Sequence, residues 1–484
     1  MSESSFRGKE ADLRLAFITC LLGLALLFPT TVWASGYRVN VQPPNGVDDT
    51  ANIQAALDAC VAHGPGCTVQ LAAGTYLTRQ LVEYHFDGTF RGMGIDITTI
   101  QALPNLPVTI NQNVSEEPQC QPNTTTCIWP SLVIFVDGKI RVSDLTFNIP
   151  SVPATQPWFL GGSSITMMFE ALGFRGQYPQ YPTHAWIDRI RILGQPDSSP
   201  SNWGFNVMMG AHFTGELPKG PKLHDYYFLS GSFTVRNSDF NTLFVGVSQD
   251  GFVKSSQITI GGSHLAGNHL ENGFGGLDIE SSENSTFDIS YNESSGMYAG
   301  MWVVPWDLTI FVPSSPSRYL IHDNKFVGTA QGANGMYLLD DPTNPWIQAA
   351  IWNNTIEVQD TLSEAMYAYY TKGTAIWNNT ITGTDGIDAI GLYSSTLGTV
   401  INNNVSGFTV DSTVGNAQIY LDPYTTKDLI VCAEPSDTVL NQGTNNTVIG
   451  CQQPTATSGA AAKSVNPATS KPRPGLPKAK AWLR

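Results

Sequence analysis

Asp278 and Glu280 are two residues apart in the segment GLDIESS, where apolar and polar residues alternate. This alternation is typical of a β-strand, in which residues two apart face the same side with Cα atoms about 6.6 Å apart. Their carboxyl groups would then fall within the separations of about 5 to 9.5 Å that glycoside hydrolysis uses. One acid would protonate the leaving oxygen, and the other would activate water or attack.

Asp340 and Asp341 form a second acidic pair at a predicted loop edge. They are candidates for the second catalytic acid or for calcium ligands, because carboxylates serve in both roles. For all four acids the alternative interpretation is a solvated acid on a surface or in a turn. We expect no cofactor, and we expect calcium only if the protein is a lyase.

Aromatic residues recur at equivalent positions of the strands that follow Asp278. Aligned strands give two outward-facing columns, because side chains alternate along a strand. The first column contains Asp278, Trp302, Tyr337, Tyr367, Gly391 and Tyr420, and the second contains Glu280, Val304, Leu339, Tyr369, Tyr393 and Asp422. Longer segments after the same strand add Trp306 and Trp346. Exposed rings beside carboxylates would suit a sugar chain; the alternative is an aromatic stack that only stabilises a β surface.

A repeated sequence unit must position these columns. The heptapeptide AIWNNTI occurs at 350–356 and again at 375–381. The column that it defines contains Ser238, Asn268, Asn292, Asn324, Asn354, Asn379 and Asn404, at steps of 24 to 32 residues. Units of this length cannot bury an apolar face alone and must stack on one another. Stacked inward asparagines would hydrogen-bond as a ladder. Asn-Asn-Thr is also a glycosylation acceptor pattern, but the regular spacing favours the ladder.

Composition favours an all-β solenoid and argues against some partners. The chain has 484 residues, 13% of them charged, with 45 glycines and 30 prolines, which suits a solenoid better than a helical domain. Residues 35–451 contain 16 basic and 37 acidic groups, a net charge of −21 (16 minus 37). This charge would repel nucleic acid, and it would repel a polyanionic glycan unless a divalent cation bridged the two.

The two ends of the chain differ in composition from residues 35–451. Residues 1–34 carry Lys9 and Arg14 before an apolar run that ends at Ala34, which predicts a secretory signal peptide. The alternative is an uncleaved membrane anchor. We expect the protein to contact a membrane only through this segment, and only if it is not cleaved. Residues 452–484 are basic and rich in proline, alanine and serine, which predicts a disordered tail. We expect residues 35–451 to form one monomeric domain that is secreted, either extracellular or periplasmic.

Six cysteines remain after the predicted signal peptide is removed. An even number in an exported chain indicates disulfides, for which six cysteines allow about 15 connectivities. Proximity in sequence favours pairing Cys60 with Cys67, Cys120 with Cys127, and Cys432 with Cys451. Metal binding by these cysteines is a weaker alternative, because no CxxC motif occurs.

Two stretches carry a family resemblance. GVDDTANIQAALDACVAHGPGCTVQLAAGTYLT at 46–78 and FRGMGIDITTI at 90–100 resemble the entry segment of the pectin-lyase-like superfamily. The resemblance implies a right-handed parallel β-helix solenoid whose open end is covered by a short N-terminal helix. Asp49 or Thr50 would cap this helix, and Ile53, Ala56 and Leu57 would supply its apolar face. Asp48 and Asp49 would then be structural.

The fold resemblance does not transfer an activity, because the Asn-Thr-Asp, Asp-Asp, Gly-His-Gly and Arg-Ile-Lys signatures of polygalacturonases do not occur in order. The columns favour an exported polysaccharide-binding protein that cleaves its ligand as a glycoside hydrolase. One alternative is a polysaccharide lyase of the pectate-lyase type, which needs a lysine or arginine base and usually calcium. The other is a non-catalytic surface or adhesin-like module.

Overall fold

The computed structural model describes residues 36–454 except 80, 104–130, 150–156, 161–162, 177–181, 195–201, 212–229, 243–244, 251–252, 268–274, 281, 298, 305–312, 329–333, 360–363 and 409–416. The chain divides into two compact units at residue 37, and all the structure described below belongs to the unit that begins at Arg38. The predicted signal peptide and nearly all of the predicted tail lie outside the described residues, and the boundaries predicted for them stay predictions. Among the described residues, no helix has the length and apolar character needed to cross a membrane.

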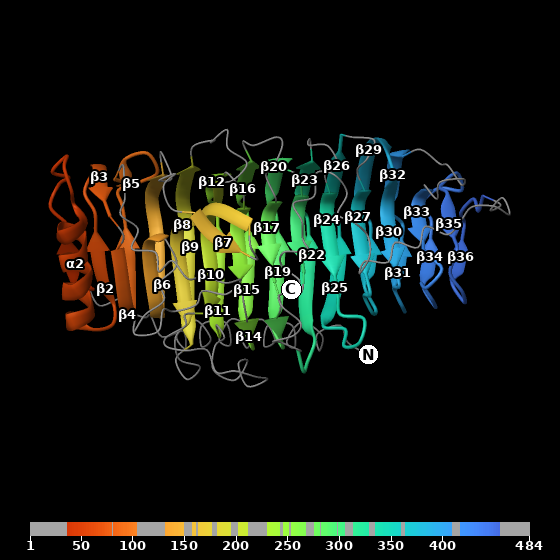
Figure 1. Ribbon diagram of the computed structural model, residues 1–484, viewed down its shortest axis with the longest axis horizontal. Helices are drawn as coiled ribbons and strands as arrows, with labels where there is room; N and C mark the ends of the chain where they lie inside the picture. Colours follow the sequence, from red (N-terminus) through yellow and green to blue (C-terminus); the bar gives the residue numbers. More distant parts are fainter. Residues whose placement is uncertain are drawn as a thin grey trace, which may run out of the picture. The chain divides into compact units, whose positions relative to one another are not determined.

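Parallel strands stack in three sheets, and each coil of the chain contributes to successive sheets (Figure 1). The first sheet contains β8 (Ser163–Gly176), β10 (Asn202–Ala211), β13 (Val245–Asp250), β17 (Gly275–Ile279), β21 (Ala299–Val303), β24 (Asn334–Leu339), β27 (Glu364–Tyr369), β30 (Asp388–Tyr393), β33 (Ala417–Leu421) and β35 (Val439–Asn441).

The second sheet runs from β1 to β36 through every part of the unit. It contains β1 (Arg38–Asn40), β2 (Cys67–Gln70), β4 (Leu81–Arg91), β6 (Ser131–Ile149), β9 (Thr183–Gly194), β11 (Gly231–Arg236), β15 (Gln257–Gly261), β19 (Thr286–Ser290), β22 (Ser317–His322), β25 (Ile347–Trp352), β28 (Ala375–Trp377), β31 (Thr399–Ile401), β34 (Leu429–Val431) and β36 (Thr447–Ile449).

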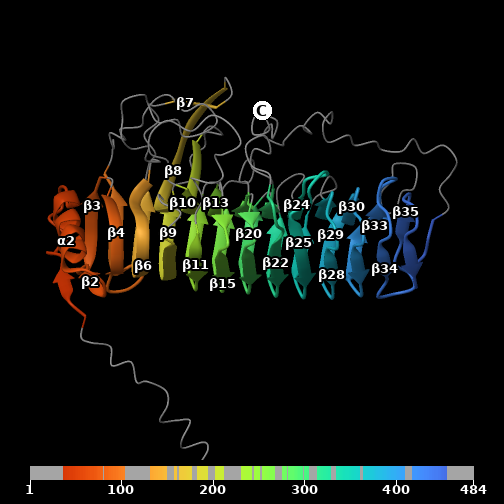
Figure 2. The same cartoon turned by 90° about the horizontal axis from the view of Figure 1, so that it is seen from below.

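The third sheet is shorter and shares the long strands β6 and β9 with the second. Its other strands are β3 (Gly74–Thr78), β5 (Thr98–Ala102), β12 (Asp239–Thr242), β16 (His264–Gly267), β20 (Glu293–Met297), β23 (Lys325–Gly328), β26 (Thr355–Val358), β29 (Thr380–Gly386) and β32 (Asn404–Phe408). Outside the stacks, β7 (Pro157–Leu160) pairs antiparallel with β8, and β14 (Val253–Lys254) pairs with β18 (Ser282–Glu283). Figure 2 shows β7 and part of β8 extending beyond the edge of the stack.

An aliphatic core runs inside the coils because every second side chain of a strand points inward. Equivalent isoleucines occupy the same inward position of successive strands of the second sheet, and Ile289, Ile321, Ile351 and Ile376 are fully buried. The predicted all-β solenoid is confirmed, because the strands of each coil pair in parallel with the equivalent strands of the next coil.

The predicted asparagine ladder lies at the turn between the second and third sheets. We use this name for Asn292, Asn324, Asn354, Asn379 and Asn403, which are all buried. In each step the backbone N–H and the Nδ2 of one asparagine donate to the Oδ1 of the next, as in Asn354 to Asn379 at 2.9 and 3.0 Å. Nδ2 of Asn354 also donates to the carbonyl of Ile321 in the preceding coil, at 2.9 Å. The ladder therefore satisfies buried amides of adjacent coils.

Two members of the predicted ladder are wrong. Asn404 is exposed at the start of β32, and the neighbouring Asn403 accepts the hydrogen bond from the N–H of Asn379 at 3.0 Å. On the other side of the ladder, Ser263 donates its backbone N–H to Asn292 Oδ1 at 3.2 Å, so serine fills the position assigned to Asn268, which itself lies outside the described residues. Ser238 follows Ser263 in the same column, as predicted.

The residue before each ladder position explains the doubled asparagine. Asn353, Asn378 and Asn402 all have a φ of 54°, in the left-handed region. Asparagine tolerates this region better than most residues with a Cβ atom. The first asparagine of each pair therefore makes the bend, and the second joins the ladder.

Helix α2 (Thr50–His63) lies at the end of the stack next to β2 and β4 (Figure 1). Its predicted apolar face is confirmed, since Ile53, Ala56 and Leu57 are buried. Asp49 occupies the cap position but makes no side-chain cap hydrogen bond; its Oδ2 accepts from Leu77 N at 3.2 Å. Asp48 Oδ1 accepts from the N–H of Thr50 instead, at 3.0 Å. Both aspartates hold the capped end in place, as expected.

Two of the three predicted disulfides are present. Cys60 bonds to Cys67, which ties α2 to β2, and Cys432 bonds to Cys451 near the last strands of the second sheet. Both bonds therefore lie at the ends of the stack, where coils have a neighbour on one side only. Cys120 and Cys127 lie outside the described residues, and their pairing stays a prediction.

Candidate functional site

The first sheet places the predicted columns in register. Asp278 pairs with Trp302, and the same position continues through Tyr337, Tyr367, Gly391 and Tyr420. In the neighbouring column Leu339 pairs with Tyr369, and Tyr369 with Tyr393. The alignment of these strands from sequence is therefore confirmed. We call Trp302, Tyr337, Tyr367, Tyr369, Tyr393 and Tyr420 the aromatic column.

The predicted exposure of the aromatic column is wrong in several places. Trp302, Tyr393 and Tyr420 retain only 9%, 7% and 2% of their exposure. Their neighbours Tyr367 and Tyr369 are half-buried and pack against Tyr393 and Tyr420. The physical reason is that stacked coils bring successive rings about one strand spacing apart, so large side chains cover one another.

Ring contacts join the whole aromatic column. Trp302 and Tyr337 meet edge to face at 5.8 Å between centroids, and Tyr337 meets Tyr367 in the same way at 5.6 Å. Tyr369 and Tyr393 stack at 4.4 Å with an angle of 10° between their planes. Tyr420 completes the series at 5.5 Å from Tyr393. Burial raises the pKa of Tyr337 and Tyr420 above the usual range for phenols, so both hydroxyls stay protonated.

The structure contradicts the predicted sugar-binding role of Trp346. Its side chain is fully buried, with the ring edge-on to Tyr319 at 6.1 Å. A ring without exposed surface cannot stack on a sugar. Trp306, the other tryptophan assigned to this wall, lies outside the described residues.

Asp340 anchors the loop that leads to Trp346. Its Oδ1 accepts from the N–H groups of Asp341 and Trp346 at 2.8 and 2.7 Å, and its Oδ2 accepts from Ile347 N at 3.0 Å. Burial raises the pKa of Asp340 to about 7 despite these bonds. Its carboxyl oxygens are therefore engaged by backbone groups of the loop.

Asp341 forms the turn of the same loop. Its Oδ1 accepts from the N–H and hydroxyl of Thr343 and from Asn344 N, at 2.6, 2.7 and 3.2 Å. This pattern is an Asx-turn, in which an aspartate replaces a backbone acceptor. The alternative interpretation of Asp340 and Asp341 as turn acids accounts for these contacts. Within the described ranges, no group of three histidine, cysteine, aspartate or glutamate residues could hold a metal ion.

Asp278 and Glu280 lie at the other end of the aromatic column. Asp278 is half-buried in β17 beside Trp302, and Glu280 follows this strand with 7% exposure. Asp278 has the predicted register with Trp302, whereas Glu280 is buried and not exposed as an outward-facing acid was expected to be. Their catalytic role stays a prediction.

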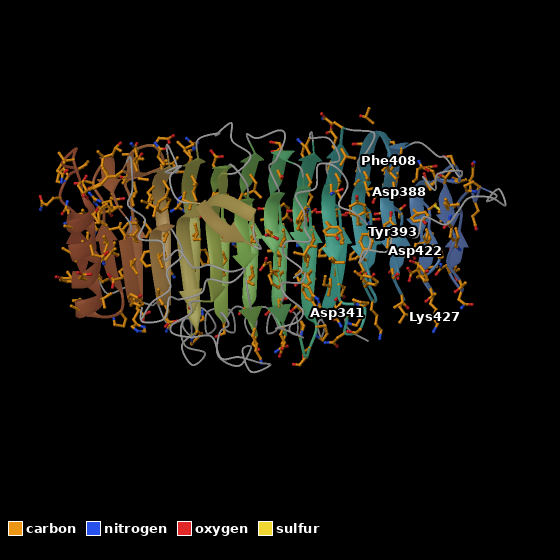
Figure 3. The ribbon with its side chains drawn as sticks, viewed as in Figure 1. Asp341, Asp388, Tyr393, Phe408, Asp422 and Lys427 are labelled. Carbon is orange, nitrogen blue, oxygen red and sulfur yellow. A yellow bond between two sulfur atoms is a disulfide. The ribbon has the colours of Figure 1, made fainter. Side chains whose placement is uncertain are left out.

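Sequence analysis missed two buried acids of the same sheet. Glu364 and Asp388 begin β27 and β30, pair in register, and keep 3% and 2% of their exposure. The Oη of Tyr393 lies 3.4 Å from Glu364 Oε2 and 3.4 Å from Asp388 Oδ2, so its one proton can be donated to either acid. Figure 3 labels Tyr393 and Asp388 near one end of the stack. Burial and the negative charge of the two acids raise the pKa of the Tyr393 hydroxyl well above the usual range.

A sequence signal for these acids exists. The strands NGMYLL, EAMYAY and DAIGLY each begin with a polar residue three positions before the first aromatic column position. Strict alternation would turn that polar residue inward, so the alternation pattern alone hides it. In the structure alternation is interrupted at the small residue that follows, which is glycine or alanine. Glu364 and Asp388 therefore lie on the same side of the sheet as Tyr393.

Comparisons with known proteins show a shared fold. No protein-family model matches the chain, and no curated protein matches its sequence. Among solved structures, the A-module of mannuronan C-5 epimerase AlgE6 from Azotobacter vinelandii is similar, with 14% identity, 84% of this chain and 95% of that chain covered, and a TM-score of 0.50.

A tailspike protein, Dettilon gp208, is similar with 12% identity and a TM-score of 0.52, over 85% of this chain and 68% of that chain. At such low identity the likeness concerns the fold alone. Together with the parallel stacks, it confirms the expected resemblance at the level of architecture. The chain therefore has a right-handed parallel β-helix fold, which is the architecture that the resemblance implied.

Proposed function

We propose that this protein is an exported polysaccharide-binding protein that hydrolyses its ligand. The observation that carries the proposal is the continuous aromatic column on the outer face of the first sheet, with carboxyl groups in register beside it. Aromatic rings present apolar faces to sugar rings, and carboxylates accept hydrogen bonds from sugar hydroxyls. The half-buried Tyr337, Tyr367 and Tyr369 would supply the contact surface.

In this proposal Asp278 and Glu280 are a candidate acid pair for hydrolysis. One carboxyl group donates its proton to the leaving glycosidic oxygen, and the other activates water or attacks the anomeric carbon. Asp278 pairs in register with Trp302, where the aromatic column would hold a sugar unit, and Glu280 follows two residues later in the chain.

Export is the second part of the proposal. Cys60–Cys67 and Cys432–Cys451 are disulfides, and disulfides persist in oxidising compartments. The apolar run in residues 1–34 favours the same compartment. The names of similar structures include an epimerase of the polysaccharide mannuronan, which supports a glycan ligand by analogy of fold only.

A non-catalytic binding module is the second candidate, and one observation favours it. The rings of the aromatic column pack closely on one another, with Tyr420 and Tyr393 almost fully covered. Such packing stabilises a β surface whether or not a ligand binds.

The test is a screen of the purified protein on neutral and acidic polysaccharides. A hydrolase releases reducing ends without an unsaturated product, and a lyase releases both. Asp278→Asn and Glu280→Gln keep the shape of the side chains while removing the acid, so they should retain binding and lose turnover. Glu357→Gln in the third sheet is the matched control. Binding without any product would support the non-catalytic module, and neither binding nor product would refute both candidates.

A further inference from the structure

The motif Asn-Asn-Thr occurs twice at the turn that holds the asparagine ladder. Asn354 and Asn379, the second asparagines of the two copies, are buried members of the ladder. Asn353 and Asn378, the first asparagines, are exposed in the left-handed position before it. In an Asn-x-Ser/Thr acceptor sequence the glycan is attached to the first asparagine. The ladder and the acceptor pattern therefore use different residues of one motif and do not exclude each other.

A third Asn-Asn-Thr motif begins at Asn445, in the turn before β36, and divides the two roles in the same way. Asn446 is the structural member, because its Oδ1 accepts from Asp428 N at 2.9 Å and its Nδ2 donates to Thr425 O at 3.1 Å. Asn445 is exposed with a φ of 59°, and Thr447, the hydroxyl residue of the motif, is exposed as well. The exposed acceptor position therefore also arises away from the ladder.

The amide nitrogen of the exposed asparagine is the atom that would carry the glycan. Asn378 Oδ1 accepts from Asn402 Nδ2 at 2.8 Å, and Asn378 Nδ2 makes no hydrogen bond to the described residues. In contrast, Nδ2 of the ladder residue Asn379 donates to Ile351 O at 3.0 Å and to Asn403 Oδ1 at 2.9 Å. Only the outer amide of the motif can therefore be substituted without loss of hydrogen bonds between coils.

We propose that Asn353, Asn378 and Asn445 are sites of N-linked glycosylation. In this reaction the amide nitrogen forms a bond to the anomeric carbon of an oligosaccharide that is carried on a lipid diphosphate. The bond from that carbon to the lipid diphosphate breaks, and the amide nitrogen loses one proton. A chain meets this donor on its export route, so the inference rests on the export part of the proposed function. It adds a modification that the proposed binding and hydrolysis do not require.

Asn292 shows why the acceptor sequence alone does not define the sites. It begins the sequence Asn-Glu-Ser, but it is 2% exposed and its Nδ2 donates to Asn324 Oδ1 at 3.0 Å. A glycan on this nitrogen would break the ladder, so we expect Asn292 to stay unmodified. Asn284 and Asn404 also begin acceptor sequences and are exposed. The proposal leaves them out, because Asn284 Nδ2 donates to Ser255 Oγ at 3.1 Å and Asn404 lies within β32 and not in a turn.

The stacking of the coils limits how the sites can be occupied. Asn353 and Asn378 directly follow Trp352 and Trp377, which pair on adjacent strands about 4.8 Å apart. An N-linked glycan is bulky, so two of them at this spacing obstruct each other. Chains with glycans on both asparagines should therefore be rarer than the two single occupancies would give if they were independent. Asn445 lies at a different turn, so its occupancy should not depend on the other two.

Peptide mapping of the protein purified from its native source tests the proposal. Peptide N-glycosidase in heavy-oxygen water converts each glycan-bearing asparagine to an aspartate that carries the heavy isotope, and an untreated sample controls for spontaneous deamidation. The label should appear at Asn445 and at one or both of Asn353 and Asn378, and it should be absent from Asn292. An unlabelled Asn445, a lack of label at both ladder-side asparagines, or a labelled Asn292 would each overturn the proposal.

A matched pair of variants made in the same source tests the acceptor sequence itself. Thr447→Ala removes the required hydroxyl and should abolish the label at Asn445, whereas Thr444→Ala, an exposed threonine outside any acceptor sequence, should retain it. Equal labelling of the two variants would contradict the assignment. If the protein is recovered outside the cell without any label, the inference is overturned while the proposed export stands. If the protein stays inside the cell, the export part fails and the inference fails with it, whereas the polysaccharide screen still decides binding and hydrolysis.

Discussion

Two columns of side chains run along the same coils with opposite chemistry. The asparagine ladder fills the turn between the second and third sheets with neutral amides. The aromatic column on the outer face of the first sheet combines phenols with carboxyl groups. An amide both donates and accepts without gaining or losing a proton, so a stack of amides satisfies itself. Carboxyl groups accept only, unless one of them is protonated.

The difference shows which groups can make the stability of this fold depend on pH. Because a buried amide stack is neutral at every pH, the ladder contributes the same stability in acid and base. Burial raises the pKa of Glu83 and of Asp340 to about 7, so the contribution of these two carboxyl groups to stability changes with pH. The pH dependence of stability therefore comes from buried carboxyl groups and not from the asparagine ladder.

Replacing a buried acid by an amide is expected to have the largest effect. Glu83 in β4 is 7% exposed, and burial together with Asp58 raises its pKa from 4.5 to about 7. Because the pKa of Glu83 is higher in the folded protein, the stabilising contribution of this carboxyl group is complete below pH 4.5. This contribution is lost as the pH rises toward 7. The free energy of unfolding of wild type should therefore fall by about 3 kcal/mol relative to that of Glu83→Gln when the pH is raised from 4 to 8.

Urea unfolding of wild type and Glu83→Gln at the two pH values measures this change. Glu357→Gln, which is less buried, serves as the control. Equal differences in unfolding free energy at both pH values would show that Glu83 does not titrate differently on folding.

Truncation of the last ladder residue tests the other column. Asn403→Ala leaves the N–H of Asn379 without its acceptor, which should cost about 1 to 3 kcal/mol of unfolding free energy. The neighbouring Asn404→Ala changes an exposed side chain and should cost less than about 0.5 kcal/mol. Denaturant unfolding compares the two directly. A larger loss for Asn404→Ala would reverse the ladder register described above.

Ring truncation measures what the aromatic column contributes to binding. Tyr337→Ala should weaken glycan affinity by up to about 1 to 3 kcal/mol, by analogy with rings that stack on nucleic-acid bases. Tyr291, which is 67% exposed beside the ladder, supplies the control variant Tyr291→Ala. Calorimetry with the glycan found by the screen gives both affinities. If Tyr337→Ala binds the glycan with unchanged affinity but melts at a lower temperature, the aromatic column stabilises the sheet and does not bind the glycan.

Much of the architecture was predictable because it repeats. The spacing of Asn324, Asn354 and Asn379 fixes which residues stack, and a stack propagates one register through all coils. For the same reason the repeat alone aligns Trp302 with Tyr337 correctly. The ends of the ladder were less predictable: at Asn403 three consecutive asparagines make the sequence ambiguous by one residue.

The sequence by itself determined the repeat, the capping helix, the two observed disulfides and the order of side chains in each column, because these depend on local pattern and period. The tertiary structure decided which side chains are covered. Trp346 is buried and the aromatic column is packed together because exposure depends on neighbours in adjacent coils. It also decided the meeting of Glu364, Asp388 and Tyr393, since a departure from strict alternation at the start of β27 and β30 turns both acids toward one hydroxyl.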